Sequence, residues 1–344
     1  MKVKKVFASQ QFLIAMAILL LAVLIQLRSG QFFVANNLVD LLRACITPCT
    51  FAIGTYMVII SGGIDVSFPG VSALSAYIVL LMQLKVNLSG GNPVIGYLLC
   101  FLVGGAIGAL SGFLIGHYRF PALIVTLGVS NIAWGILYGP LNNLTYPLPD
   151  GAMAWARTNL FSVKSSFTGG STPIPALVLV VLGMIVLTSF IMNKTMLGRG
   201  IYAMGGNVDS ASRVGFNVLA LHIFVYAFAG GLAGIGGYNR LLLSKMLQTI
   251  DQSGYEMTII AGVVLGGVRI TGGMGTLSGA LLGTIFLTIL SNSLMMLGFS
   301  PYWANAVTGV VIILGISMTG IQKLLGKRHR TRKISPEYGK KEGV

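Results

Sequence analysis

The chain has 344 residues, of which 55% are hydrophobic and only 9% are charged, and its mean hydropathy is +0.85. A typical soluble domain carries about 25% charged residues, so this composition excludes a water-soluble globular protein. The formal net charge of +15 would suit nucleic acid, but 8 of the 23 lysines and arginines lie between Lys323 and Lys341, directly after an apolar segment. A basic cluster at that position is attracted to anionic lipid, so membrane lipid is the expected partner and nucleic acid is not.

Apolar segments recur along the chain, each near the roughly 20 residues that a helix needs to cross about 30 Å of hydrocarbon. They predict an all-α polytopic membrane protein with about ten transmembrane helices in one domain, residues 1–322, followed by a basic cytoplasmic tail, residues 323–344. The eighth segment is short enough to cross only partly or to be buried among its neighbours. The predicted spans are 12–27, 45–60, 68–84, 94–116, 121–139, 174–192, 221–239, 255–268, 274–297 and 302–320.

The first segment follows three lysines, as the apolar part of a secretory signal would, but Leu27-Arg28-Ser29-Gly30 lacks a small-x-small cleavage pattern, so we predict a retained span. An inside amino terminus places 16 basic residues in cytoplasmic segments and 7 outside. This bias predicts that both termini are cytoplasmic.

Two predicted connections are too long to be simple turns. The external one, 140–173, carries Trp155 and Arg157 and is either a cap or docking surface or a plain solvated loop. The cytoplasmic one, 193–220, contains the signals of a short surface helix. Asn207 suits the N-cap, Asp209 the first turn, Arg213 the last turn and Gly215 a left-handed exit.

Glycines at every fourth position put a ridge of small residues along one face of the fourth span, where they would permit close helix contact. The four are Gly104, Gly108, Gly112 and Gly116.

Residues that carry catalytic chemistry are scarce. The three histidines form no His-Glu-x-x-His pattern, the three cysteines have no metal or redox spacing, and no Gly-x-x-x-x-Gly-Lys-Ser/Thr phosphate loop occurs. We therefore expect no catalytic residue, no metal site and no cofactor bound by this chain; if ATP drives the protein, another chain must bind it. Asp65 and Glu256 are the only acids near the ends of apolar spans. Each suits a helix start or an interface better than a proton relay, although the relay stays open. Gly62, Gly63 and Asp65 also suit a break or tight turn between the second and third spans, which Asp65 would fix through side-chain hydrogen bonds to backbone amides.

Neutral polar side chains on the apolar spans are the remaining candidates. Facing a shared cavity, they would suit a neutral, multiply hydroxylated solute; alternatively, each bonds a neighbouring helix. The candidate pathway residues are Asp65, Ser67, Thr126, Asn131, Asn239, Glu256, Asn292 and Asn305.

Four stretches of the chain carry recognisable motifs. The first is Ser61-Gly-Gly-Ile-Asp-Val-Ser-Phe-Pro-Gly70, and the second is Pro121-Ala-Leu-Ile-Val-Thr-Leu-Gly128. The third stretch runs from Gly198 to Gly215, and the fourth covers Val263–Gly267 and Gly272–Gly279. Together they resemble the ribose-type permease family of bacterial ABC importers. The first is similar to the family's Gly-Gly-Ile-Asp-Leu-Ser-Val-Gly, from which Phe68 and Pro69 depart, and the second is close to Pro-Ala-Phe-Ile-Val-Thr-Leu-Gly. The order and spacing match over about residues 50–315.

The resemblance implies the ten-helix fold of the larger ABC importers, in the bacterial inner membrane. It also implies partners: a second permease copy or paralogue, ATPase subunits that carry ATP and magnesium, and a periplasmic or lipoprotein solute-binding protein. The third stretch would then meet the ATPase. Its candidate coupling residues are Gly198, Arg199, Gly205, Gly206, Asn207, Arg213 and Gly215.

Three functions follow from these observations. The first is the permease subunit of an ABC importer for a sugar or a related small polar solute, with nucleosides and furanones as alternative cargo. The second is an ion-coupled carrier that uses Asp65 or Glu256 as its relay. The third is a membrane scaffold that docks partners through its two long connections.

Overall fold

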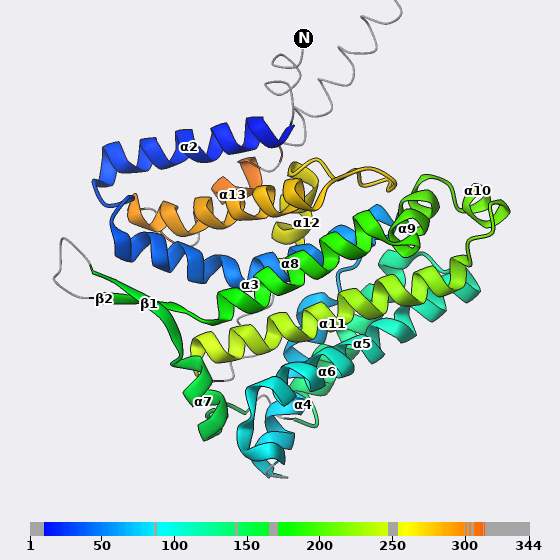
Figure 1. Cartoon of the computed structure of the whole chain (residues 1–344), viewed down its shortest axis with the longest axis horizontal. Helices are drawn as coiled ribbons and strands as arrows, with labels where there is room; N and C mark the ends of the chain where they lie inside the picture. Colours follow the sequence, from blue (N-terminus) through cyan, green and yellow to red (C-terminus); the bar gives the residue numbers. More distant parts are fainter. Residues whose placement is uncertain are drawn as a thin grey trace, which may run out of the picture.

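The computed structural model describes residues 10–85, 88–141, 144–164, 171–246 and 254–298, together with residues 300, 303, 306–311 and 313. Helices dominate the described residues (Figure 1). In chain order the elements are α2 (Gln10–Ser29), α3 (Ala35–Ile60), α4 (Phe68–Lys85), the 3-10 turn η1 (Leu88–Gly91), α5 (Pro93–Tyr118), α6 (Ala122–Tyr138), α7 (Asp150–Ala156), β1 (Asn159–Lys164), β2 (Ser171–Pro175), α8 (Leu177–Lys194), α9 (Met196–Gly206), α10 (Val208–Arg213), α11 (Val218–Ser244), α12 (Tyr255–Leu265) and α13 (Leu277–Met296).

Seven helices of the described part are long and apolar enough to cross a membrane: α2, α3, α4, α5, α8, α11 and α13. The apolar helices α6 and α12 are shorter, with 17 and 11 residues. Together they coincide with the first nine predicted spans, while the tenth, 302–320, lies mostly outside the described residues, as do Asn305 and the basic tail. The count of ten therefore stays a prediction. At 1.5 Å per residue α12 is only about 16 Å long and cannot cross the hydrocarbon alone, as the short eighth segment of the sequence predicts.

The start of α3 corrects the predicted boundary. The sequence places this span at 45–60, but the helix begins at Ala35. Its first turns carry Asn36, Asn37, Asp40 and Arg43, which end an apolar run without ending a helix, because none of them interrupts the backbone hydrogen bonding. Hydropathy therefore located the apolar part of α3 rather than its true start.

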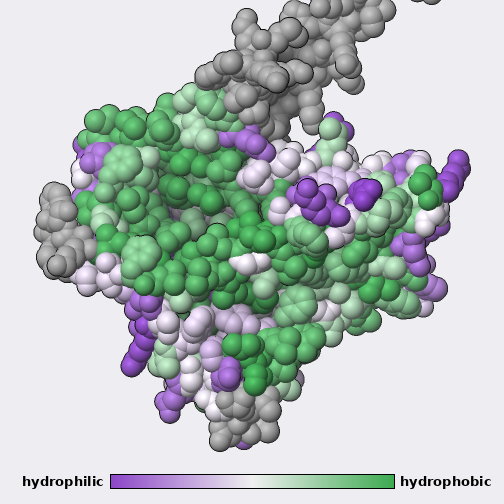
Figure 2. All heavy atoms as spheres, viewed as in Figure 1, coloured by the Kyte–Doolittle hydropathy of each residue, from purple (hydrophilic) through white to green (hydrophobic). Residues whose placement is uncertain are grey.

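The bundle is arranged around α3 and α11, which are buried along most of their length. Helices α2 and α13 lie on one side of this pair, and α4, α5 and α6 lie on the other (Figure 1). By contrast, Leu20 and Leu27 of α2 and Val186 and Phe190 of α8 are more than half exposed. Figure 2 shows the resulting apolar surface across the middle of the molecule, with polar surface at the α9–α10 end and around α7. An apolar belt between polar ends is the surface that a bilayer requires.

The ridge of glycines on α5 packs against α11, as predicted. A methyl group on Gly104 would overlap the carbonyl oxygen of Gly230, and one on Gly108 would overlap that of Tyr226. At Gly112 the methyl group would lie 2.6 Å from the His222 carbonyl oxygen. The two helices therefore touch backbone to backbone, which only glycine permits.

We predict that Gly108→Ala destabilises the protein, because the added methyl group forces α5 away from α11, and overpacking of this kind costs about 1–3 kcal/mol. Gly128→Ala is the matched control, since a methyl group at Gly128 of α6 would meet nothing within 4 Å. Thermal unfolding of the two detergent-solubilised variants measures the difference. Equal melting temperatures would contradict the close packing.

The connection 140–173 is folded rather than a plain loop. Its described residues include α7, β1 and the start of β2. The two strands pair antiparallel, with Ser162 opposite Pro173 and Val163 opposite Thr172. The short hairpin is an addition to a mostly helical structure, which confirms the predicted all-α class. It lies at the opposite end of the bundle from α9 and α10 (Figure 1).

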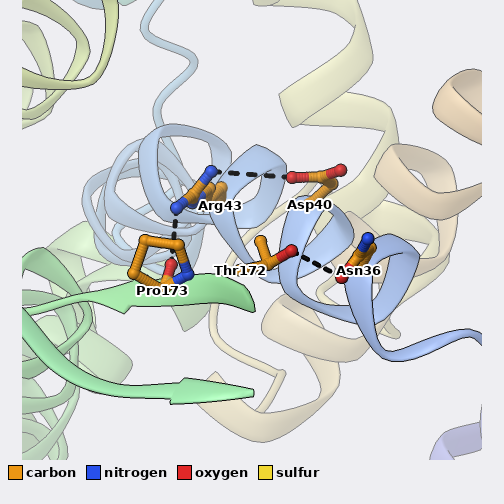
Figure 3. A network of polar contacts seen from close by, with 5 residues as sticks. All are labelled: Asn36, Asp40, Arg43, Thr172 and Pro173. Carbon is orange, nitrogen blue, oxygen red and sulfur yellow. Dashed lines mark hydrogen bonds and ion pairs between the residues drawn. The ribbon is translucent and has the colours of Figure 1, made fainter. Parts of the chain in front are cut away.

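Polar contacts attach the hairpin to the first half of α3 (Figure 3). The Arg43 guanidinium donates a hydrogen bond to the Pro173 carbonyl oxygen, and the Thr172 hydroxyl donates to Asn36 Oδ1. Asp40 lies 3.7 Å from Arg43 and is largely exposed. The polar turns at the start of α3, which hydropathy excluded from the predicted span, are thus the anchor of this hairpin.

Loss of the Arg43 anchor should loosen the hairpin. We predict that Arg43→Ala makes the segment 159–175 more sensitive to protease, since a hydrogen bond from a charged donor contributes about 1.5–3 kcal/mol. Asp40→Ala should change little, because exposed ion pairs contribute about 0–1 kcal/mol. Limited proteolysis with mapping of the fragments compares the two variants. Similar cleavage of Arg43→Ala and wild type would show that the anchor does not hold the hairpin.

Candidate coupling site

The short helix predicted after Asn207 is present as α10. Its N-cap is Asn207, whose side-chain oxygen accepts a hydrogen bond of 2.8 Å from the Ser210 amide. At the other end Gly215 has φ of +95°. Its amide donates to the Ser212 carbonyl oxygen, and the Phe216 amide donates to the Ala211 carbonyl oxygen. This pair of bonds is a Schellman motif, so both ends of α10 are defined by local sequence. The predicted coupling residue Arg213 is exposed in its last turn.

The helix before it, α9, was not predicted. Thr195 caps it by accepting from the Gly198 amide at 3.3 Å, and its buried face is formed by Gly198, Ile201, Met204 and Gly205. The signal in the sequence was Thr195 followed by small or apolar residues at spacings of three and four. The segment did not look helical because glycine is a poor helix former. Arg199 points away from this face and is exposed.

The end of α9 meets the ends of two other segments at four glycines, here called the glycine junction: Gly62, Gly205, Gly272 and Gly273. A methyl group on Gly205 would overlap the Ile60 carbonyl oxygen and lie 2.7 Å from the Gly273 amide nitrogen. The same Ile60 carbonyl accepts a hydrogen bond of 2.9 Å from Gly273. A methyl group on Gly272 would lie 2.7 Å from the Gly205 carbonyl oxygen and 2.8 Å from Gly62 Cα.

Three of the four junction glycines also need their backbone freedom. Gly62, Gly272 and Gly273 have φ of +90°, +83° and +71°, in the left-handed region that favours glycine. They belong to the loops 61–67, between α3 and α4, and 266–276, between α12 and α13. Three of the four stretches singled out in the sequence thus converge at one point.

Two tyrosines tie the same three segments together a second time. The hydroxyls of Tyr56 in α3 and Tyr202 in α9 are 2.6 Å apart, and the Tyr202 hydroxyl donates to the Gly275 carbonyl oxygen at 3.0 Å. Tyr202 therefore donates to the loop 266–276 and accepts from α3. Neither tyrosine was predicted as a site residue, because a lone tyrosine in an apolar segment carries no local signal.

Asp65 fixes the loop 61–67, which is the turn role that its sequence context predicts. Its carboxylate accepts from the Ser67 amide at 2.7 Å and from the Ser67 hydroxyl at 2.6 Å, and both residues are buried. Burial raises the pKa of the Asp65 carboxyl above its usual value, although the two hydrogen bonds from Ser67 act to lower it. From helix α6, the Thr126 hydroxyl accepts from the Val66 amide at 3.3 Å and lies within hydrogen-bond distance of the Ile64 carbonyl. Asp65, Ser67 and Thr126 are thus brought together around one loop.

The other candidate pathway residues lie elsewhere. Asn239 is fully buried, accepts from Tyr97 at 2.6 Å and donates to Thr50. Asn292 donates to the Thr288 carbonyl of its own helix at 2.8 Å. Asn131 is exposed on α6, and Glu256 is half-buried in the first turn of α12. Helix bonding explains Asn239 and Asn292, and a role in a solute pathway stays a prediction for all of them.

An open cavity of about 590 Å³ separates α10 from the bundle beside the junction. Its wall includes Ser61, Arg119, Asp209, His222 and Tyr226. Among the described residues, the buried Tyr226 hydroxyl and His222 Nδ1 find no hydrogen-bond partner. Nor do three His, Cys, Asp or Glu side chains come close enough to hold a metal ion in that part of the chain.

Comparison with known proteins gives the family. Residues 37–316 match the family model described as branched-chain amino acid transport system / permease component. The ribose import permease protein RbsC of Escherichia coli (strain K12) is 31% identical over 302 residues, which cover 87% of this chain and 90% of the relative. RbsC of Bacillus subtilis (strain 168) is 30% identical over 88% of this chain and 90% of its own length, and the autoinducer 2 import system permease protein LsrC of Photorhabdus luminescens is 28% identical over 88% of each chain.

No solved structure matches the chain significantly. The match to the family model and to the ribose permeases agrees with the multi-pass bundle and with the position of the quoted stretches around the junction. This chain therefore belongs to the ribose-type ABC transporter permeases, within the family of branched-chain amino acid transport system permease components.

Proposed function

We propose that this chain is the transmembrane permease subunit of an ATP-driven importer for a sugar or a similar small polar solute, in which partner ATPase subunits drive alternating access. The observation that carries the proposal is α10, a helix capped at both ends that projects from the bundle directly beyond the glycine junction. A helix so placed can follow the movement of a partner and pass it to the spans as rigid-body motion. The names of the relatives, which import ribose or autoinducer 2, support the solute class.

Contacts at the α10 end of the molecule support a proposed orientation of the chain in the membrane. Gln11, near the start of α2, donates to the hydroxyls of Thr276 and Ser278, beside the junction. The amino-terminal end of α2 and α10 thus share one side, which we assign to the cytoplasm of a bacterial cell on the bias of basic residues. The hairpin and α7 then face outward, where a periplasmic or lipoprotein solute-binding protein delivers the solute.

The proposed partners are supported by the names of the relatives, which are permeases of import systems, and by the missing phosphate loop in this sequence. ATP and magnesium belong to ATPase subunits that contact α10, and a second permease copy or a paralogue completes the pathway. The residues proposed to meet the ATPase are the exposed ones of α9 and α10, Arg199 and Arg213 among them.

Proteoliposomes test this function. They would contain this chain with the ATPase and the binding protein encoded beside it, and the first probe would be labelled ribose, followed by a furanone and a nucleoside. We expect uptake only with ATP and magnesium on the side of α10, and no ATP hydrolysis by the isolated chain. Uptake under an ion gradient without ATP would overturn the proposal in favour of an ion-coupled carrier.

Substitutions of Asp65 distinguish the ATP-driven importer from the ion-coupled carrier. Asp65→Asn removes the charge but keeps a side-chain oxygen for the two Ser67 donors, so ATP-dependent uptake should largely survive. Asp65→Leu leaves those buried donors without an acceptor, at a cost of about 1–3 kcal/mol, and should reduce the yield of assembled complex. Uptake per assembled complex is the measurement. Its abolition in Asp65→Asn at normal yield would identify the carboxylate as an ion relay.

A further inference from the structure

We propose that the glycine junction makes the loops 61–67 and 266–276 move as one unit with α10, and that Gly205 is the positioning residue of this unit. The inference rests on the proposed function, since α10 must be displaced by a partner for the junction to act. It adds a specific route from that helix into the bundle. The first step of this route is the link between α10 and α9.

Helices α10 and α9 cannot move independently. A single residue, Asn207, joins them; its amide donates to the Ala203 carbonyl of α9 at 3.0 Å while its side chain caps α10. A displacement of α10 is thus transferred to the carboxyl end of α9. The open cavity of about 590 Å³ beside α10 leaves room for such a displacement toward the bundle.

At the end of α9 the contact is between backbones. Gly205 faces the Ile60 carbonyl and the Gly273 amide so closely that a methyl group has no space. Long side chains absorb a small displacement by changing rotamer, but a backbone in contact with a backbone transmits it, because neither surface can yield. Gly205 therefore pushes on α3 and on the loop 266–276 at the same point.

The two loops are bound to each other as well as to α9. Gly273 donates to Ile60 at 2.9 Å, and the loop 266–276 is closed internally by hydrogen bonds of 2.9 Å from Arg269 to Met274 and from Gly272 to Arg269. Tyr202 holds Gly275 from the other side. The loop therefore moves as a body, and the glycines at 62, 272 and 273 hold left-handed backbone conformations that other residues would strain.

Beyond the junction, the movement reaches the starts of three helices. Loop 61–67 ends at α4 and is attached to α6 through Thr126, while loop 266–276 leads into α13. One displacement at α10 thus acts on α4, α6 and α13 together. Coupling of this kind rests on a connected element with two positions, not on spatial proximity alone.

Gly205→Ala in the reconstituted complex tests the proposal. We expect solute-dependent stimulation of hydrolysis and uptake, both measured per assembled complex, to fall by about tenfold, within the range typical of coupling between sites. Gly183→Ala is the matched control, because a methyl group at this position of α8 meets nothing within 4 Å. Its ratio of uptake to hydrolysis should equal that of wild type. Unchanged coupling in Gly205→Ala would overturn the proposal.

A second pair of variants decides the case in which Gly205→Ala does not assemble. Tyr202→Phe removes the bonds to Tyr56 and Gly275 without adding volume, whereas Tyr56→Phe removes only the first. We expect uptake per ATP hydrolysed to fall more in Tyr202→Phe than in Tyr56→Phe, at equal melting temperature and yield. Equal ratios in both variants and wild type would contradict the proposal, whereas a wild-type complex without ATP-dependent uptake would contradict the proposed function instead.

Discussion

The fold depends on the contact of one backbone with another at positions where only glycine fits. Lipid tails are as apolar as leucine, so helices in a bilayer gain little from burying apolar side chains and associate through close packing instead. Glycines of α5 meet the backbone of α11 in this way, and those of α12 meet α13, where a methyl group on Gly266 would overlap the Gly279 carbonyl and one on Gly283 would overlap that of Gly262. The same device holds the interior of the bundle and the place where its helices break.

Broken helices in a membrane protein create a second requirement, because each break exposes backbone groups that lipid cannot satisfy. The break after Ile60 is closed by Gly273, Asp65 and Ser67, and Thr126 contributes from a third helix. Such a break can be retained only where several segments cooperate, so the loops 61–67 and 266–276 depend on each other for stability. This mutual dependence makes joint movement the natural response of the two loops to a displacement of α9.

Sequence reasoning succeeded where the determining interactions are local. The caps of α10 lie within four residues of its ends, and the helix was predicted with its N-cap and its glycine exit. The spacing of the α5 glycines predicted a packing ridge, since a period of four defines one face of a helix. The turn role of Asp65 was also predicted, because its partner Ser67 is two residues away.

The remaining features depend on residues far apart in the chain. Nothing near Gly205 indicates Ile60 or Gly273, and nothing near Arg43 indicates Pro173. The candidate pathway residues illustrate the same limit: Asn239 is a polar residue on an apolar helix, but its partners Thr50 and Tyr97 come from α3 and α5. A sequence pattern identified the polar residues and could not assign their partners.

These contacts distinguish two possible mechanisms, one that uses a buried charge and one that uses backbone packing. Asp65, the acid placed best for an ion relay, has its carboxylate engaged by two donors of Ser67, and its loop is held by the junction. An ion relay needs a carboxylate that exchanges partners, whereas a mechanical route needs a loop that keeps its shape while it moves. The observed geometry meets the second requirement. A bundle built in this way suits force applied at α10 better than protonation in its interior, which agrees with the proposed drive by a partner subunit.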